Sequence, residues 1–353
     1  TWRGGYGGDD PQMSSRPDGS DSIPSAFRAT ARRLAEQPAM LGAGGEWTFA
    51  RLDRESDSLA AGFLRIGIVP GARIGLYCPN SPEFASVYLA ILKAGAVVVP
   101  VNVMLNPKEV AFVMADAGAT GLFYHAAFAD AAAQVREVAS GLELAVRIGD
   151  GPGEDPSLAE VAVPGGRPPE PSNEPGRDLA AILYTSGTTG RPKGAMLTHR
   201  NLMSNTASVM QALELQPGRD RMLVVLPMFH AFAATVGMLT PLVHGLSLVI
   251  VERFEPKLVS AVIAEHGATV FLGVPSMYTL LLRLEEAELH QWQSVRFCVS
   301  GGAAMPGAVM AAFEERFGIP VLEGDGPTEC SPVTCVNPLS GTRKYGSVGR
   351  PVP

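Results

Sequence analysis

The sequence predicts an α/β protein in which strands alternate with helices, so that a parallel sheet is covered on both faces. Composition is the first support for this class. The 353 residues are 46% hydrophobic, enough for a large core, and 39 glycines and 29 prolines supply many turns. The second support is the alternation of short apolar runs with amphipathic runs of helical period. At about 150 residues per domain, the length predicts two or three structural units.

The first ordered element is predicted to be a helix that begins near Ile23. Ile23, Phe27, Ala31 and Leu34 recur at the spacing of one helix face, and Pro24 suits the first turn.

A second helix is predicted within residues 47–68. Thr48 serves as its N-cap, and Leu52, Leu59 and Phe63 lie on one face. Strands and helices then alternate, in the order strand 72–78, helix 81–95, strand 96–102 and helix 106–119.

Residues 151–176 are dense in proline, glycine and acidic residues. This composition is typical either of a linker between subdomains or of one long surface loop, and the sequence leaves both open. After this segment the alternation resumes. The predicted strands are 179–185, 194–199, 221–227, 246–252, 268–275 and 294–302. The predicted helices are 200–213, 257–267, 276–289 and 306–318.

The charge pattern argues against nucleic acid as a partner. The chain has 28 basic and 35 acidic residues, a net charge of -7, and no basic cluster. Only Cys330 and Cys335 lie close together among four cysteines, and no second pair or histidine completes a zinc pattern. Reduced thiols in a cytosolic protein are therefore expected.

The N-terminal residues 1–22 are rich in Gly, Asp and Ser and lack the apolar core of a secretory signal. We expect a disordered tail, with residues 1–12 as a cloning remnant and Met13 as the native start. No apolar run reaches the roughly 18 residues of a membrane span.

The stretch YTSGTTGRPKG, residues 184–194, carries the clearest chemical signal. Its glycines expose backbone N–H groups, its hydroxyls add donors, and Lys193 adds a compact positive charge. These groups suit a polyphosphate, which offers many acceptor oxygens and several negative charges. The apolar flanks ILY and AML indicate a loop between two strands. The common pattern GxxxxGK[ST] is absent, because Pro192 precedes the lysine and Gly194 follows it.

These eleven positions resemble the phosphate-loop signature of the adenylate-forming (AMP-binding) enzymes, which include acyl-CoA synthetases, peptide-synthetase adenylation domains and luciferases. LKAGAVVVPVN upstream also fits that family. Four later stretches follow in the family's order: PMFHAF (227–232), VSGGAAMP (299–306), EGDGPTECSP (323–332) and GSVGRPVP (346–353). The resemblance covers about residues 23–353.

The resemblance implies the fold of the family's large N-terminal domain. Two stacked sheets carry helices on their faces in αβαβα order, and a small β-barrel starts at the C-terminal end. The expected subdomains are 23–170, then 171–340 with the phosphate loop and acyl pocket, and 341–353 as the start of the barrel.

The resemblance also assigns roles to residues. Thr328 would bond the α-phosphate of ATP, and Glu329 would carry Mg²⁺, since a hard cation prefers oxygen ligands. Asp325 and Gly326 would lie beside the adenine. Gly301, Gly302 and Ala303 would form a backbone wall against adenine and the acyl group. The pyrophosphate moiety would be held by Thr185, Ser186, Gly187, Thr188, Thr189, Gly190 and Lys193.

His230 lies among apolar residues in LPMFHAFA. It is either a buried core histidine or, from its place in the family motif, part of the carboxylate and catalytic site. Phe229 and Phe232 are expected to pack. Candidates for an acyl tunnel, or for ordinary packing at a strand end, are Gly273, Val274, Pro275 and Met277.

Two features depart from the family pattern. Asp325 stands where an aromatic ring usually stacks on adenine, which is worth about 1–3 kcal/mol. A carboxylate cannot stack, so it either accepts from the exocyclic amine or weakens ATP binding. The sequence also ends at Pro353, before the family's ribose-binding Asp, hinge and C-terminal lid domain with its catalytic lysine. We therefore expect the large domain alone, with little adenylation activity in isolation.

The resemblance implies an AMP-forming acid–thiol ligase that uses ATP, Mg²⁺ and coenzyme A. EGDGPTECSP after RFGIPVLE looks most like medium- and long-chain fatty acyl-CoA synthetases. The alternatives are an aryl-acid CoA ligase, a fatty acyl-AMP ligase that loads a carrier protein, and a non-catalytic nucleotide-binding module. A cytoplasmic protein is expected, and both a homodimer and peripheral membrane contact are compatible with it.

Overall fold

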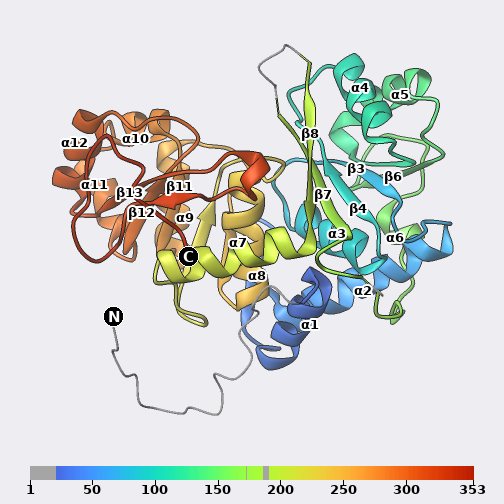
Figure 1. Ribbon diagram of the computed structural model, residues 1–353, viewed down its shortest axis with the longest axis horizontal. Coiled ribbons are helices and arrows are strands. Elements are labelled where there is room, and N and C mark those ends of the chain that lie inside the picture. Colours follow the sequence, from blue (N-terminus) through green and yellow to red (C-terminus); the bar gives the residue numbers. More distant parts are fainter. Residues whose placement is uncertain (1–20, 172, 186–190) are drawn as a thin grey trace.

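The computed structural model describes residues 21–171, 173–185 and 191–353, and its strands form two sheets. In spatial order the nine-stranded sheet consists of β15 (Arg350–Pro351), β14 (Cys335–Val336), β13 (Val321–Asp325), β12 (Phe297–Ser300), β11 (Val270–Gly273), β9 (Arg221–Val224), β10 (Ser247–Ile250), β1 (Pro38–Gly42) and β2 (Trp47–Thr48). The six-stranded sheet consists of β6 (Leu144–Ile148), β5 (Gly121–His125), β3 (Arg73–Tyr77), β4 (Val97–Pro100), β7 (Leu179–Thr185) and β8 (Lys193–Thr198). In Figure 1 strands β11 to β13 lie on the left, and β3, β4, β6, β7 and β8 lie on the right.

Neighbouring strands are mostly parallel, in agreement with the alternation seen in the sequence. The antiparallel pairs are β1–β2, β7–β8, β13–β14 and β14–β15. Two parallel pairs join distant parts of the chain, because β1 pairs with β10 and β4 pairs with β7. Both pairs cross the boundary expected at residue 170, so each sheet contains strands from both sides of the segment 151–176.

Helices lie between the sheets and on both outer faces. The outer face of the nine-stranded sheet packs against α9 (Pro256–His266), α10 (Pro275–Leu281) and α12 (Gly307–Phe317). That of the six-stranded sheet packs against α4 (Pro107–Ala117) and α5 (Ala129–Val138). Between the sheets lie α1 (Ile23–Arg33), α2 (Phe49–Arg65), α3 (Pro82–Lys93), α7 (His199–Ala212), α8 (Thr240–His244) and the π-helix η3 (Phe232–Leu239). This order is the αβαβα layering that the family resemblance implies.

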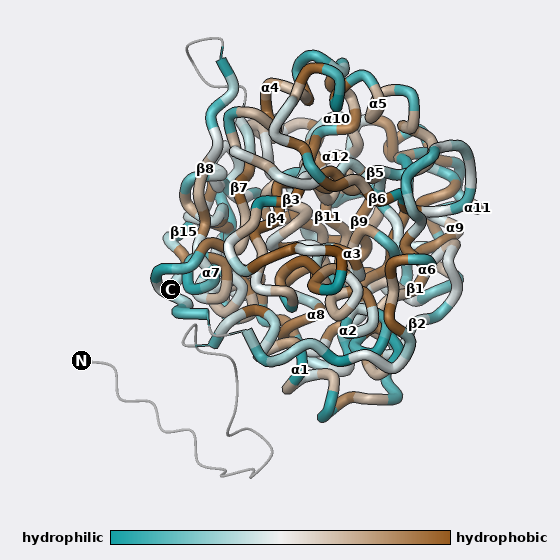
Figure 2. The backbone as a smooth tube through the Cα atoms, turned by 90° about the vertical axis from the view of Figure 1, so that its right-hand side faces the viewer, coloured by the Kyte–Doolittle hydropathy of each residue, from teal (hydrophilic) through white to brown (hydrophobic). Residues whose placement is uncertain are grey.

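Strand β9 shows how period-two alternation serves two cores. Met222 and Val224 point into the central core between the sheets, whereas Leu223 belongs to the outer core under α9 and α10. All three side chains are fully buried, and each contributes roughly 1.5–3 kcal/mol through burial. In Figure 2, which colours the backbone by hydropathy, many brown segments lie inside and teal segments lie mostly at the periphery.

Local signals in the sequence set several helix starts. Thr48 caps α2, because its hydroxyl accepts from the Arg51 amide at 3.2 Å. Pro24 occupies the first turn of α1, and Asn106 forms a capping box with Glu109 before α4. The Thr48 and Asn106 side chains satisfy amide groups that have no partner within the helix.

The helix predicted over 276–289 is instead two helices, α10 and α11 (Glu286–Leu289). Arg316 of α12 explains the break. Its guanidinium donates to the carbonyl of Leu282 at 2.8 Å and to that of Leu284. Carbonyls that a continuous helix would use are thus bonded by a distant side chain. Glu285 is the N-cap of the new helix, and its amide donates to the Glu288 carboxylate at 2.8 Å.

A buried ionic cluster joins α1, α2 and α3 to the segment before β7. Lys93 contacts Asp53 at 2.6 Å and Asp57 at 2.8 Å, and its side chain is fully buried. Arg28 contacts the same Asp57 at 2.9 Å and Glu170 at 2.6 Å. Glu170 belongs to the segment 151–176, so this segment is fastened to the helices between the sheets.

The C-terminal residues 341–353 contribute only β15, and the part of the chain described here contains no closed barrel. The shorter elements are η2 (Ala126–Phe128), α6 (Leu158–Val161), η4 (His290–Trp292) and η5 (Thr328–Cys330). Over residues 21–353, apart from the gaps named above, we find no helix with the length and apolar character that a bilayer crossing requires.

Candidate functional site

The phosphate-loop motif is a β-hairpin, as its apolar flanks predict. Strands β7 and β8 pair antiparallel, with Thr185 opposite Lys193 and Tyr184 opposite Gly194. The Tyr184 hydroxyl donates to Asp116 of α4 at 2.6 Å. Its ring covers Gly194, where a Cβ would lie 3.1 Å from ring carbons and 2.8 Å from an Ile182 methyl group, so a side chain there would crowd both neighbours. Ser186, Gly187, Thr188, Thr189 and Gly190 lie outside the described residues.

A large cleft opens between this hairpin and α4. It has a volume of about 930 Å³, and it contains three of the residues predicted for the site, Thr185, His230 and Thr328. The cations Lys108 and Arg191 also line it. Thr328 begins the short helix η5, which packs against β8, so it approaches the strand that carries Lys193. The cleft therefore combines hydroxyls and positive charge, which suit a polyphosphate.

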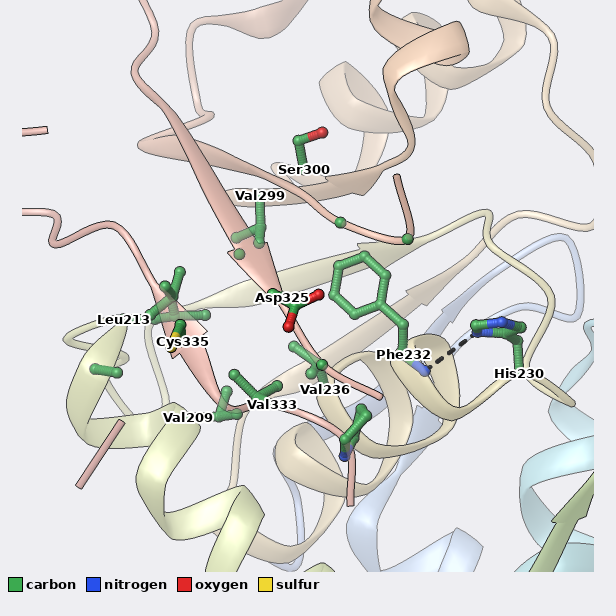
Figure 3. A pocket seen from close by; sticks show the side chains of 17 residues that line it. Val209, Leu213, His230, Phe232, Val236, Val299, Ser300, Asp325, Val333 and Cys335 are labelled. Atoms are coloured by element: carbon green, nitrogen blue, oxygen red, sulfur yellow. Dashed lines mark hydrogen bonds between the residues drawn. The ribbon is translucent and has the colours of Figure 1, made fainter. Parts of the chain in front are cut away.

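A second, apolar pocket of about 50 Å³ lies on the other side of His230 (Figure 3). Its walls come from α7, η3, β12 and the β13–β14 pair. Its aliphatic lining is Val209, Ala212, Leu213, Val236, Val299, Val333 and Val336. The predicted residues Phe232, Gly301, Gly302, Asp325 and Gly326 line it as well. An apolar pocket beside a polar cleft is the arrangement that a carboxylic acid with a hydrophobic tail would occupy.

His230 is the residue shared by the two cavities. Its Nδ1 accepts from the Phe232 amide at 3.5 Å, drawn as the dashed line in Figure 3, which leaves Nε2 as the N–H donor of the neutral ring. The ring has exposed surface, yet nearby protein removes enough water to lower its pKa. His230 is thus a neutral donor at the junction rather than a buried core histidine.

Glycines in the predicted backbone wall allow neighbouring protein atoms to lie close to the backbone. A Cβ on Gly301 would lie 3.1 Å from the Phe232 ring, and one on Gly326 would lie 2.5 Å from the Pro332 carbonyl oxygen. Gly326 has no room for a side chain, because the obstacle is backbone, and at Gly301 a side chain would press against the Phe232 ring. Ala303 is exposed and follows this wall without lining the pocket.

Asp325 ends β13 at the edge of the apolar pocket, and its side chain is exposed. The Thr334 hydroxyl donates to the Asp325 carbonyl at 3.1 Å and to its carboxylate at 3.4 Å. The carboxylate is thereby held at the position where family members usually place an aromatic ring beside adenine. Figure 3 shows it near Phe232 and Val333.

The remaining predicted residues lie near the site but line neither cavity. Lys193 and Glu329 are exposed, on β8 and on η5. Gly273 faces the rings of Phe271 and Tyr278. Val274 and Met277 pack against the core, and the half-buried Pro275 opens α10. Among the described residues no group of three His, Cys, Asp or Glu side chains could hold a metal. A magnesium ion at Glu329 would therefore need phosphate and water oxygens as further ligands.

Two asparagines near the site were missed by the sequence analysis. Asn80 bonds the backbone of Leu226 and Met228, just before His230. Asn205 of α7 bonds both backbone groups of Val333 in the apolar pocket, at 2.8 and 3.2 Å. The only signal for Asn80 was a polar residue three positions after the end of a strand, which is also the composition of an ordinary turn.

The comparisons with known proteins agree with this geometry. A family model described as "AMP-binding enzyme" matches residues 27–353. The chain is 33% identical to a sulfoacetate–CoA ligase from Cupriavidus necator, over 95% of this chain and 65% of that protein. It is 33% identical to a long-chain-fatty-acid–CoA ligase from Yersinia pestis, over 96% of this chain and 65% of that protein. The chain thus spans 65% of the length of these relatives.

Solved structures share the fold. An anthranilate CoA ligase in complex with anthranoyl-AMP matches with a TM-score of 0.88 and 26% identity, over 94% of this chain and 65% of that one. The N-terminal domain of FACL13 from Mycobacterium tuberculosis, with bound inhibitor, matches with a TM-score of 0.84 and 30% identity. The match covers 94% of this chain and 82% of that one. The hairpin motif, the two cavities and these matches lead to one conclusion: the chain belongs to the AMP-binding enzyme family.

Proposed function

We propose that this chain is the ATP- and acid-binding part of an AMP-forming acid–thiol ligase. The observation that carries the proposal is that His230 lines both cavities. An acid whose tail fills the apolar pocket would present its carboxylate beside this imidazole, at the edge of the cleft that suits phosphates. The carboxylate and the α-phosphate would meet there to form acyl-adenylate and pyrophosphate.

The residues of the cleft meet the main difficulty of this reaction, because two anions must approach each other. Lys108 and Arg191 in the cleft, and Lys193 on the adjacent strand β8, would reduce the repulsion. The hydroxyls of Thr185 and Thr328 would donate to phosphate oxygens. The neutral His230 would donate to the carboxylate and orient it without removing its nucleophilic lone pair. Magnesium, held by Glu329 and phosphate oxygens, would supply further charge neutralisation during the transfer.

Coenzyme A is proposed as the thiol that then takes the acyl group and releases AMP. The support is the set of CoA ligases and synthases among the relatives. Cys78, Cys298, Cys330 and Cys335 are all free thiols, which is consistent with a reducing cytoplasm.

The lining of the apolar pocket favours an uncharged hydrophobic acid. Its described lining contains Asp325 but no lysine or arginine. A sulfonate tail, as in the substrate named for the Cupriavidus relative, would lose its hydration there without gaining a counter-charge. A fatty acid is therefore the leading substrate class. A compact aryl acid is the second candidate, because the cavity volume is only about 50 Å³.

ATP–pyrophosphate exchange by the complete protein tests the proposal. The acids would be saturated acids from acetate to palmitate, benzoate, anthranilate, ferulate and sulfoacetate, each at equal concentration. We expect exchange with a fatty or aryl acid and none with sulfoacetate. Exchange with sulfoacetate alone would refute the substrate class, and no exchange with any acid would refute the proposed activity.

A further inference from the structure

Asn80 connects the two sheets immediately beside the candidate site. It follows β3 of the six-stranded sheet, and its side chain is buried. Its amide nitrogen donates to the carbonyls of Leu226 at 2.9 Å and Val251 at 3.3 Å. Its oxygen accepts from the Met228 amide at 2.7 Å. Leu226 and Val251 lie just beyond β9 and β10, so one carboxamide bonds the chain at the ends of two strands of the other sheet.

Two of the three backbone groups that Asn80 bonds, those of Leu226 and Met228, belong to the turn that presents His230. Leu226 and Met228 flank Pro227, and the His230 amide donates to the Pro227 carbonyl at 2.9 Å. The His230 carbonyl then accepts from the Ala234 amide at 2.9 Å, near the start of η3. His230 is therefore fixed on one side by a turn that Asn80 bonds twice, and on the other side by a helix.

We propose that Asn80 is a positioning residue, which holds His230 at the junction of the apolar pocket and the phosphate cleft. This proposal rests on the proposed function, because it assigns His230 to the meeting point of carboxylate and phosphate. The physical reason is that residues 226–230 leave the nine-stranded sheet and have no strand partner for the Leu226 carbonyl and the Met228 amide. Asn80 supplies both partners at once and fixes the turn to the six-stranded sheet, which carries the phosphate hairpin.

The test compares three variants in the complete protein. Asn80→Ala removes all three bonds, and Asn80→Asp keeps an acceptor for the Met228 amide while removing both donated bonds. Thr30→Val is the matched control. Thr30 is also buried and donates to a backbone carbonyl, that of Val243 at 2.7 Å, but it lines neither cavity.

For Asn80→Ala we expect kcat to fall about 100-fold, the effect of roughly 1 Å of misplacement at a reacting group. The KM for the acid should rise, and the KM for ATP should change much less, because the hairpin is untouched. Asn80→Asp should lie between wild type and Asn80→Ala. Thr30→Val should keep wild-type kinetics at a temperature where all variants are folded. Wild-type kinetics for Asn80→Ala, or an equal loss in Thr30→Val, would overturn the proposal.

A second readout does not depend on activity. NMR titration of the His230 imidazole, assigned with His230→Gln, reports how much water surrounds the ring. In Asn80→Ala the pKa of His230 should move from its lowered value back toward that of a free histidine. An unchanged titration would refute the positioning role. If the wild-type protein shows no exchange with any acid, the proposed function fails, and this titration still decides whether Asn80 positions His230.

Discussion

Thr185 lies directly opposite Lys193 across the antiparallel pair of β7 and β8. Side chains of directly opposed residues emerge on the same face of a sheet, about 4.5–5.5 Å apart at Cβ. A hydroxyl donor and an ammonium group therefore stand side by side at the base of the phosphate hairpin. The pairing fixes the spacing of the two backbone positions that carry the donor and the charge, whereas the flexible lysine side chain leaves its ammonium group free to adjust.

Lys193→Gln should lower kcat/KM for ATP by about 10², the typical cost of removing one donor to a developing charge. Lys193→Arg should retain part of the activity, because it keeps the charge but changes its shape. ATP–pyrophosphate exchange at varied ATP measures both. Lys257→Gln is the control, since Lys257 is exposed on α9 and pairs with Glu288 far from either cavity. An equal loss in the control would contradict a specific role for Lys193.

Asp325→Tyr should lower the KM for ATP by about 5-fold or more, because a ring at this edge would stack on adenine at about 1–3 kcal/mol per base. Steady-state kinetics at saturating acid gives the value. Asp325→Asn removes the charge without adding a ring and separates the two explanations. If Asp325→Asn lowers the KM for ATP as much as Asp325→Tyr does, charge repulsion rather than missing stacking weakens ATP binding in the wild type. A KM that rises in Asp325→Tyr would show that the carboxylate itself contacts the nucleotide.

Ala212→Phe should shift the preferred acid toward smaller ones, because Ala212 of α7 lines the apolar pocket. Each excluded CH₂ forfeits about 0.8 kcal/mol, or about fourfold in kcat/KM. A chain-length series in the exchange assay measures the shift. Gln211→Phe adds the same ring one residue earlier, at an exposed position outside the pocket. An unchanged chain-length preference in Ala212→Phe would mean that the acyl group lies elsewhere.

Stability should fall in mild acid because of His199. This residue begins α7, and its ring bonds the Ile23 amide at 3.3 Å and Asn173 at 3.1 Å. Burial lowers its pKa to about 4, although the charge of Asp178 opposes the shift. The folded state thus favours the neutral ring. Its contribution is complete above the unfolded pKa of about 6.5 and declines as the pH falls from there to about 4.

The expected loss is about 3 kcal/mol in the free energy of unfolding across this window. Urea denaturation at pH 7, 6, 5 and 4 measures it. His199→Gln should be less stable at pH 7 but should lack this part of the pH dependence. His290→Gln, at an exposed position, should keep the wild-type slope. A wild-type slope in His199→Gln would assign the acid sensitivity to other groups.

Local chemistry made part of this molecule predictable. The apolar flanks of the hydroxyl- and glycine-rich motif predicted a loop between two strands, and Thr48 predicted the start of α2, because both depend on neighbouring residues. The break between α10 and α11 was not predictable, because it depends on Arg316, some 30 residues away in the sequence. Asn80 was missed for the same reason, since its partners follow it by 146 to 171 positions. Periodicity shows which face of α7 is buried, but not that Ala212 faces a pocket instead of solid core.

The pairings of β1 with β10 and of β4 with β7 have a consequence during synthesis of the protein. Met40 pairs with Leu248 and Val98 with Ala181, so neither sheet can close while only the first half has left the ribosome. Until then a nascent chain exposes unpaired strand edges and apolar faces, and contacts of such long range form slowly. Translation would therefore release an intermediate that chaperones recognise, and the yield of soluble protein should depend on them.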